Sequence, residues 1–173
     1  MNYFLVPILS ILFIFLLFGT FFIVKQQSAA IVERFGKFVS VRHSGLQIKI
    51  PIIDNVAGRL SLRIQQLDVV VETKTKDDVF VKVKVSVQYK VIKDKVYDAF
   101  YKLDYPQDQI TSYVFDVVRA EVPKMILDDV FEKKDDIAIA VKTELNDAMR
   151  NYGFDIIKTL SLIHISEPTR RRH

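Results

Sequence analysis

The chain contains no cysteine and no tryptophan. The absence of cysteine excludes a disulfide framework, a thiolate metal site and a cysteine nucleophile. Histidine occurs three times, and only His43 lies outside the last ten residues. A single imidazole in a Val-Arg-His-Ser-Gly segment is more typical of a surface turn than of a general base. The five glycines form neither a GxGxxG motif nor a Walker motif, so no phosphate-binding loop is predicted.

Clusters of catalytic or metal-binding side chains are also missing. Carboxylates occur as adjacent pairs, Asp77-Asp78, Asp128-Asp129 and Asp135-Asp136. Neighbours on a strand point to opposite faces, and acidic residues near a helix start favour the helix dipole. These pairs are therefore predicted to be turn and capping residues. The sequence predicts no catalytic, cofactor-binding or metal-binding residue and no cofactor, and we expect the protein not to be an enzyme.

One long hydrophobic run stands at the N-terminus. No charged residue occurs from Asn2 to Val24. A run of about 20 apolar residues is long enough to cross a hydrocarbon core about 30 Å thick. The run predicts a transmembrane anchor over residues 1–25. A cleaved signal peptide is the alternative, with Ser28-Ala29-Ala30 as its cleavage site, but no basic residue precedes the run and the run is too long. A buried helix of a soluble protein is the weakest of the three interpretations.

The charges beside this run predict its orientation. Lys25, Arg34 and Lys37 follow the run, and no Lys or Arg precedes it. The positive-inside rule then places the rest of the chain in the cytoplasm. The expected protein is a single-pass membrane protein with one cytoplasmic domain.

The segment after the anchor is rich in β-branched and aromatic residues. Candidate strands are Ile31–Phe35, Val39–Val41 and Leu46–Ile50, separated by Gly and Pro. Apolar and polar residues then alternate from Val79 to Val91 and from Leu67 to Thr73, which predicts an antiparallel hairpin with one buried face. The lysines on the polar face lack interleaved aromatic residues, so we expect a solvated face and no nucleic-acid partner.

The period of the pattern changes after Val91. Asp94 is predicted to cap a short helix that ends at Leu103, and Asp104 and Pro106 are predicted to open a second helix, which Pro123 ends. Apolar residues at helical spacing predict a third helix, with Gly153 as its C-terminal cap, followed by a strand. The third helix is predicted over Ile137 to Tyr152 and the strand over Phe154 to Thr159.

This order of elements predicts an α+β fold. The expected soluble domain covers residues 26–159, with a β-rich part over residues 26–92 and a helical part over residues 93–159.

Four segments of the chain carry a recognisable pattern, namely Ala30–Phe38, Gly45–Asp54, Val69–Val91 and Ile110–Phe131, the last with Arg119-Ala-Glu-Val-Pro123. Together they resemble the stomatin, prohibitin, flotillin and bacterial protease-modulator superfamily, called SPFH or band 7. Glu33, Arg34, Gly36 and Pro51 match the opening motif, which is structural. The chain is most similar to the bacterial stomatin-like branch and the plant hypersensitive-induced-reaction branch.

The resemblance implies a membrane-anchored scaffold. It would contact membrane lipids, form a homo-oligomer in its full-length form, organise membrane microdomains, and modulate partners such as a membrane protease or channel. The alternative is a regulatory adaptor of such a protease or channel without scaffold assembly, and an enzyme is the weakest hypothesis. Members of the superfamily continue into a long coiled coil that drives assembly, and no such heptad segment is present here.

The C-terminal residues differ from the rest of the chain. The segment Leu160 to Arg170 resembles the translation of a transposase-type sequencing adapter. We therefore expect residues 160–173 to be a non-native tail and the family domain to end near Thr159. The alternative is a natural short basic tail, because Arg170, Arg171 and Arg172 with Glu167 supply a net charge of +2.

Overall fold

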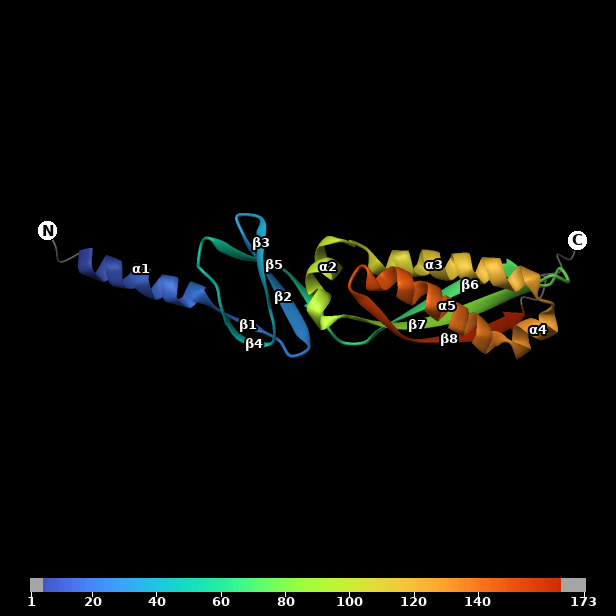
Figure 1. Cartoon of the computed structure of the whole chain (residues 1–173). Helices are drawn as coiled ribbons and strands as arrows, with labels where there is room; N and C mark the ends of the chain where they lie inside the picture. The colour runs from blue at the N-terminus through green and yellow to red at the C-terminus, as the bar shows by residue number, and fades with distance from the viewer. Residues whose placement is uncertain (1–4, 166–173) are drawn as a thin grey trace, which may run out of the picture. The chain divides into compact units, whose positions relative to one another are not determined.

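The computed structural model describes residues 5–165 (Figure 1). The chain divides into two compact units, and the boundary lies between Arg63 and Ile64. The elements of the first unit are α1 (Leu5–Thr20), β1 (Phe21–Val24), β2 (Ser28–Arg34), β3 (Lys37–Arg42), β4 (Gly45–Ile48) and β5 (Asp54–Ser61).

The strands of the first unit form two small antiparallel sheets. β1 pairs with β4, and β2 lies between β3 and β5. Residues Ala29 to Val32 of β2 are buried although they point alternately to both faces of the sheet. The centre of this unit is therefore one short strand covered on both sides, and its core is small.

The helix at the start of the chain is shorter than the sequence predicted. The predicted anchor covered residues 1–25, whereas α1 ends at Thr20 and Phe21 to Val24 form β1. These residues pair with Gly45 to Ile48, and the Lys49 N–H donates to the Thr20 carbonyl at 2.8 Å. Strand pairing thus takes backbone groups that the helix would have used, and the predicted extent of the anchor helix is wrong. Residues 1–4 of the predicted anchor lie outside the described residues.

The structure does not show a membrane-spanning helix in the part of the chain that it describes. Between residues 5 and 165, no helix has both the length and the apolar character that crossing a membrane needs.

The second unit contains one sheet and most of the helices. The sheet has the order β6-β7-β8, and all neighbours are antiparallel. Its strands are β6 (Gln65–Lys74), β7 (Phe80–Val91) and β8 (Phe154–Ile165), and its helices are α2 (Val96–Tyr101), α3 (Pro106–Glu121), α4 (Leu127–Glu132) and α5 (Lys134–Arg150), with 3-10 turns η1 (Lys93–Lys95) and η2 (Val122–Lys124).

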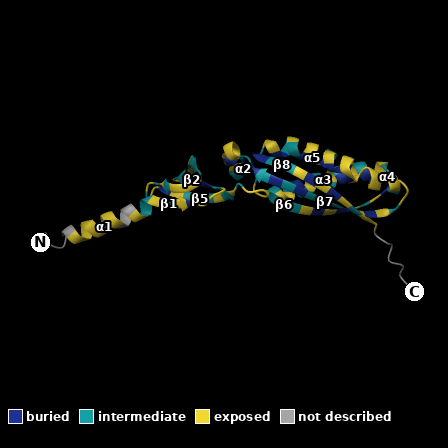
Figure 2. Cartoon of the chain, turned by 90° about the horizontal axis from the view of Figure 1, so that it is seen from below, coloured by how far each residue is buried: buried dark blue, intermediate teal, exposed yellow. Residues whose placement is uncertain are grey.

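The predicted hairpin is confirmed by the pairing of β6 with β7. Val69 lies opposite Val85 and Val71 opposite Val83, so the valines of both strands share one face. Helices α3 and α5 cover this face, and the buried residues in Figure 2 follow β7, β8 and the inner sides of the two helices. The largest fully buried residues of the second unit are Tyr89, Ile110, Ile137, Leu145 and Met149. The predicted α+β class is confirmed.

The predicted helix caps are partly wrong. The N-cap residues of α2 and α3 are Lys95 and Tyr105, and neither uses its side chain as a cap, so Asp94 and Asp104 do not cap these helices. Pro106 occupies the first turn of α3, as the sequence predicted. Pro stabilises a helix start because it lacks the N–H that would remain unpaired there, which makes a side-chain cap less necessary.

The last described strand extends past the predicted end of the family domain. β8 pairs with β7 from Phe154 to Ile165. The hypothesis that residues 160–173 are a non-native tail stays a prediction, and residues 166–173 lie outside the described residues.

Candidate functional site

The first unit exposes a group of large apolar side chains at α1, β1 and β4. Phe18, Phe21, Phe22, Ile23 and Leu46 line a depression of about 520 Å³, which we call the apolar depression. The exposed fractions of Phe18, Ile23 and Leu46 lie between 65% and 81%. Large apolar side chains are therefore exposed in a part of the protein that strand pairing orders.

Two turns lie next to one another at one end of the β3-β2-β5 sheet. Arg34 at the end of β2 is the register partner of Asp54 at the start of β5. The Arg34 Nε atom lies 2.7 Å from Asp54 Oδ1, and the Ile50 N–H donates to Asp54 Oδ2 at 3.0 Å. The Asp54 N–H also donates to the Ile50 carbonyl at 2.9 Å. This ion pair therefore joins the β2–β3 turn to the turn over residues 50–54.

The same contacts keep the Asp54 carboxylate charged. Asp54 is 8% exposed. The hydrogen bond from Arg34 and the backbone N–H of Ile50 together lower the pKa of Asp54 below its usual value of 3.8. The link between the two turns is therefore complete at neutral pH.

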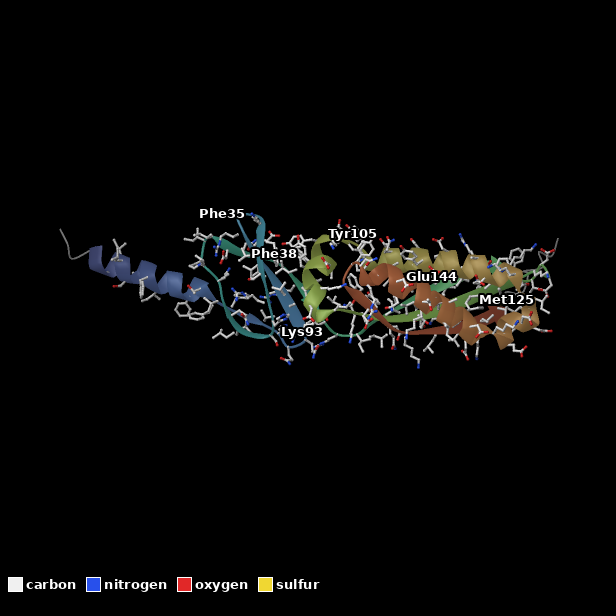
Figure 3. All side chains as sticks on the ribbon, viewed as in Figure 1. Phe35, Phe38, Lys93, Tyr105, Met125 and Glu144 are labelled. Atoms are coloured by element: carbon white, nitrogen blue, oxygen red, sulfur yellow. The ribbon has the colours of Figure 1, made fainter. Side chains whose placement is uncertain are left out.

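Each of these turns carries a bulky apolar residue in the left-handed backbone region. Phe35 has φ 51° and is 84% exposed, and Ile52 has φ 72° and is 90% exposed. Figure 3 labels Phe35 at the β2–β3 turn. A two-residue hairpin turn of this kind favours Asn-Gly, and Gly36 with φ 78° fits while Phe35 does not. The left-handed conformation costs a residue with a side chain about 1–2 kcal/mol, most of all a β-branched one. These two residues are thus both strained and exposed.

Positive charge accompanies the apolar surface of the first unit. Residues 1–63 contain seven Lys or Arg and two Asp or Glu, whereas residues 64–159 contain fifteen Lys or Arg and eighteen Asp or Glu. The first unit therefore has a net charge of +5 and the second, up to Thr159, a net charge of −3. An apolar surface with excess cations attracts a partner that combines hydrocarbon with negative charge.

The open face of the second unit has a different character. Lys84 lies 2.8 Å from Asp68, and Lys82 lies 2.7 Å from Glu72, so charges on β6 and β7 pair across the strands. Hydrogen bonds from Lys84, Ser86 and Gln66 lower the pKa of Asp68 to about 2. This face is a solvated ladder of ion pairs, as the alternation in the sequence predicted.

The predicted placement of the acidic pairs near helix starts is confirmed for two pairs, but their predicted capping role is wrong, because the N-cap residues of α4 and α5 are Ile126 and Lys133 and neither helix has a side-chain cap. Asp128 and Asp129 lie in the first turn of α4, and Asp135 and Asp136 in that of α5.

The role of Asp77 could not be found from the sequence. Asp77 Oδ1 accepts the Leu127 N–H at 3.1 Å, and the Lys76 N–H donates to the Met125 carbonyl at 2.8 Å. A hydrogen bond from the Thr75 hydroxyl lowers the pKa of Asp77. Asp77 thus satisfies the first N–H of α4 from a turn 50 residues earlier in the chain.

No group of three or more His, Asp and Glu side chains in residues 5–165 is placed to hold a metal ion. His43 follows β3, is half-buried, and its carbonyl accepts a hydrogen bond from Gln47 Nε2 at 3.0 Å. Its buried Nδ1 atom has no hydrogen-bond partner in the described part of the chain.

Comparison with known proteins identifies the family of this chain. Residues 22–170 match the model of the SPFH domain / Band 7 family. The chain belongs to this family. The resemblance seen in the sequence is therefore confirmed.

Three related proteins differ in how similar they are to this chain. Hypersensitive-induced response protein 4 of Arabidopsis thaliana is 45% identical over 150 residues, which cover 86% of this chain and 51% of that protein. Human stomatin-like protein 2, mitochondrial, is 29% identical over 136 residues, or 78% of this chain and 38% of that protein. Stomatin-like protein stl-1 of Caenorhabditis elegans is 30% identical, and 41% of its length is covered. The chain therefore spans about half or less of the length of these relatives.

Proposed function

We propose that the protein is a membrane-associated scaffold of the SPFH/Band 7 family that contacts lipid through the apolar surface of its first unit. The second unit, with its paired surface charges, presents a water-compatible surface to partner proteins. In the full-length form the scaffold assembles with copies of itself, organises membrane microdomains and modulates membrane-protein partners such as a protease or channel. The single-pass topology with a cytoplasmic domain stays a prediction.

The exposed apolar side chains of the first unit carry this proposal. Large exposed apolar patches on a folded protein mark contacts with a membrane or a partner. Helix α1 contains no charged residue, and Ile8, Leu9, Ile11, Phe13 and Ile14 are all between 52% and 67% exposed. A helix that is apolar all round needs apolar surroundings on every side, and lipid supplies them more readily than one partner groove. The excess of cations in this unit favours anionic head groups.

Vesicle flotation tests the membrane contact. We expect the full chain, purified in detergent and transferred to phosphatidylcholine and phosphatidylserine vesicles, to float with the vesicles and to remain bound after alkaline carbonate washing. The Ile23→Glu substitution places a charge in the apolar depression, where the side chain is 67% exposed. It should reduce the vesicle-bound fraction about tenfold or more, because burying a carboxylate beside hydrocarbon is unfavourable.

A matched control lies on the second unit. Val70 on β6 is 52% exposed, and Val70→Glu should leave vesicle binding unchanged. A chain that stays in the aqueous fraction would refute the proposed membrane contact, and equal binding by both variants would refute the part that the apolar depression has in it.

Crosslinking of the full-length natural protein tests the scaffold itself. Ladders of self-crosslinked species are expected from a scaffold. One-to-one complexes with a different protein would instead identify the regulatory adaptor.

A further inference from the structure

We propose that Phe35 and Ile52 form a lipid-inserting wedge, separate from α1, that enters the boundary between head groups and acyl chains of one leaflet. This inference deepens the proposed function and rests on it. We call the two side chains the turn-tip wedge.

The backbone at both positions favours other residues. Phe35 and Ile52 have φ of 51° and 72°, a region that Gly and Asn adopt more easily than aromatic or β-branched residues. Their side chains are 84% and 90% exposed, so they contribute almost nothing to the core. Asn at either position would relieve the backbone strain and suit water better. Neither local conformation nor packing explains these residues, whereas contact with hydrocarbon does.

The two tips are held at the same end of the sheet. Arg34 and Asp54 form an ion pair at 2.7 Å. Arg34 directly precedes the β2–β3 turn, and Asp54 closes the turn over residues 50–54. The turn over residues 50–54 also contacts the C-terminal end of α1, because a Cβ atom on Gly19 would lie 3.2 Å from the Pro51 Cβ atom. The turn that carries Ile52 therefore lies beside the apolar helix that we propose to contact lipid.

Lipid fits these tips better than a protein partner does. The wedge consists of two protruding side chains on two turns, and the groove of this unit, the apolar depression, is lined by other residues. Lys37 is exposed two residues after Phe35, whereas the charge of Arg34 is already paired with Asp54. An apolar tip with an exposed cation beside it is typical of segments that lie at a membrane surface, where hydrocarbon surrounds the tip and phosphate binds the cation.

Asparagine substitutions separate membrane binding from stability. Phe35→Asn and Ile52→Asn should each keep or raise the thermal midpoint of unfolding, because Asn tolerates the left-handed region. Each should weaken binding to phosphatidylcholine and phosphatidylserine vesicles about tenfold, since the buried apolar side chain is lost. The control Phe35→Leu keeps both the hydrocarbon and the strain, and it should bind vesicles within about threefold of the parent chain.

The absence of tryptophan allows a direct test of insertion. Phe35→Trp and Ile52→Trp each introduce a single fluorophore, and we expect a blue-shifted emission on vesicles and quenching by brominated acyl chains. Phe131→Trp is the control, because Phe131 is 40% exposed on α4 of the second unit. Its emission should not change when vesicles are added.

The outcomes distinguish the wedge from the proposed function. If the parent chain itself does not bind vesicles, the proposed function fails. If the parent chain binds and the Asn variants bind equally well, or if the Phe35→Trp and Ile52→Trp emissions do not shift on vesicles, the wedge alone is overturned.

Discussion

The two units of this chain place their apolar residues in opposite ways. In the described residues, the first unit has five buried apolar core residues and the second has twenty-two. The first unit instead exposes Phe18, Ile23, Leu46, Phe35 and Ile52. Hydrophobic content therefore does not predict a core, because the same residue types are buried in one unit and exposed at the surface of the other.

The two units also differ in how their surface charges are paired. The second unit pairs Lys82 and Lys84 with carboxylates on the neighbouring strand, whereas the first unit has a surplus of cations. Paired charges of both signs favour a surface in contact with water, and a surplus of one sign beside hydrocarbon favours an oppositely charged, amphipathic partner. Substitutions confined to one unit therefore test whether the two units differ in this way.

The largest effect is expected from Gly153→Ala in the second unit. Gly153 has φ +84°, and an added Cβ atom would lie 2.5 Å from the Lys95 carbonyl oxygen and 3.1 Å from the Ala99 nitrogen. The left-handed strain and the displaced backbone together should lower the free energy of unfolding by about 4 kcal/mol, measured by urea denaturation.

The matched control is a glycine of the first unit. Gly36 has φ +78° and open space around the added atom, so Gly36→Ala should cost only about 1 kcal/mol. Equal losses for both variants would show that backbone strain alone, and not close packing, makes Gly153 necessary.

A pair of leucines gives the next largest effect. Leu145 on α5 is fully buried, and Leu145→Ala should lower the free energy of unfolding by about 3 kcal/mol because it leaves a cavity. Leu46 is 65% exposed, and Leu46→Ala should change the free energy of unfolding by less than about 0.5 kcal/mol while it weakens vesicle binding. If Leu46→Ala destabilised the chain as much as Leu145→Ala, the first unit would bury this side chain and the comparison would be wrong.

The smallest effect concerns the pH dependence of the second unit. The pKa of Asp68 is lowered from 3.8 to about 2, so the folded state favours its charged form. The resulting stabilisation is complete above pH 3.8 and is lost as the pH falls toward 2. Asp68→Asn should therefore remove part of the fall in the thermal midpoint between pH 5 and pH 2, roughly the range in which a paired Asp titrates.

Glu72→Gln is the control for this measurement. Glu72 pairs with Lys82, and its side chain is 67% exposed against 40% for Asp68, so this substitution should have a smaller effect. Identical acid profiles of the parent chain and Asp68→Asn would contradict the role of the hydrogen bonds to Asp68.

The elements that could be predicted from the sequence are those with one buried and one solvated face. The hairpin of β6 and β7 has this property, and so do α3 and α5, whose apolar residues recur at helical spacing. The spacing of the apolar residues along these elements follows directly from which face is buried. The family could be predicted as well, because its motifs lie in these elements and in β2 to β4.

The elements that could not be predicted depend on distant or unpatterned contacts. Phe21 to Val24 continue the apolar run of α1, and only pairing with β4 makes them a strand. β5 is too polar to show a strand pattern, although it pairs with β2 along its length. Phe35 and Ile52 gave no turn signal, because the residues that usually indicate positive φ are Gly and Asn. The candidate site was missed because it consists of these features.

The contact between Asp77 and the start of α4 couples two segments that are far apart in sequence. Asp77 lies in the tip of the hairpin and accepts the Leu127 N–H, and the neighbouring Lys76 N–H donates to the Met125 carbonyl. Opening the hairpin tip therefore releases the first amide of α4, and unwinding α4 leaves the Asp77 carboxylate without that donor. The two segments should fray as one cooperative unit, so that amide exchange at one end of the sheet reports the loss of a helix 50 residues away.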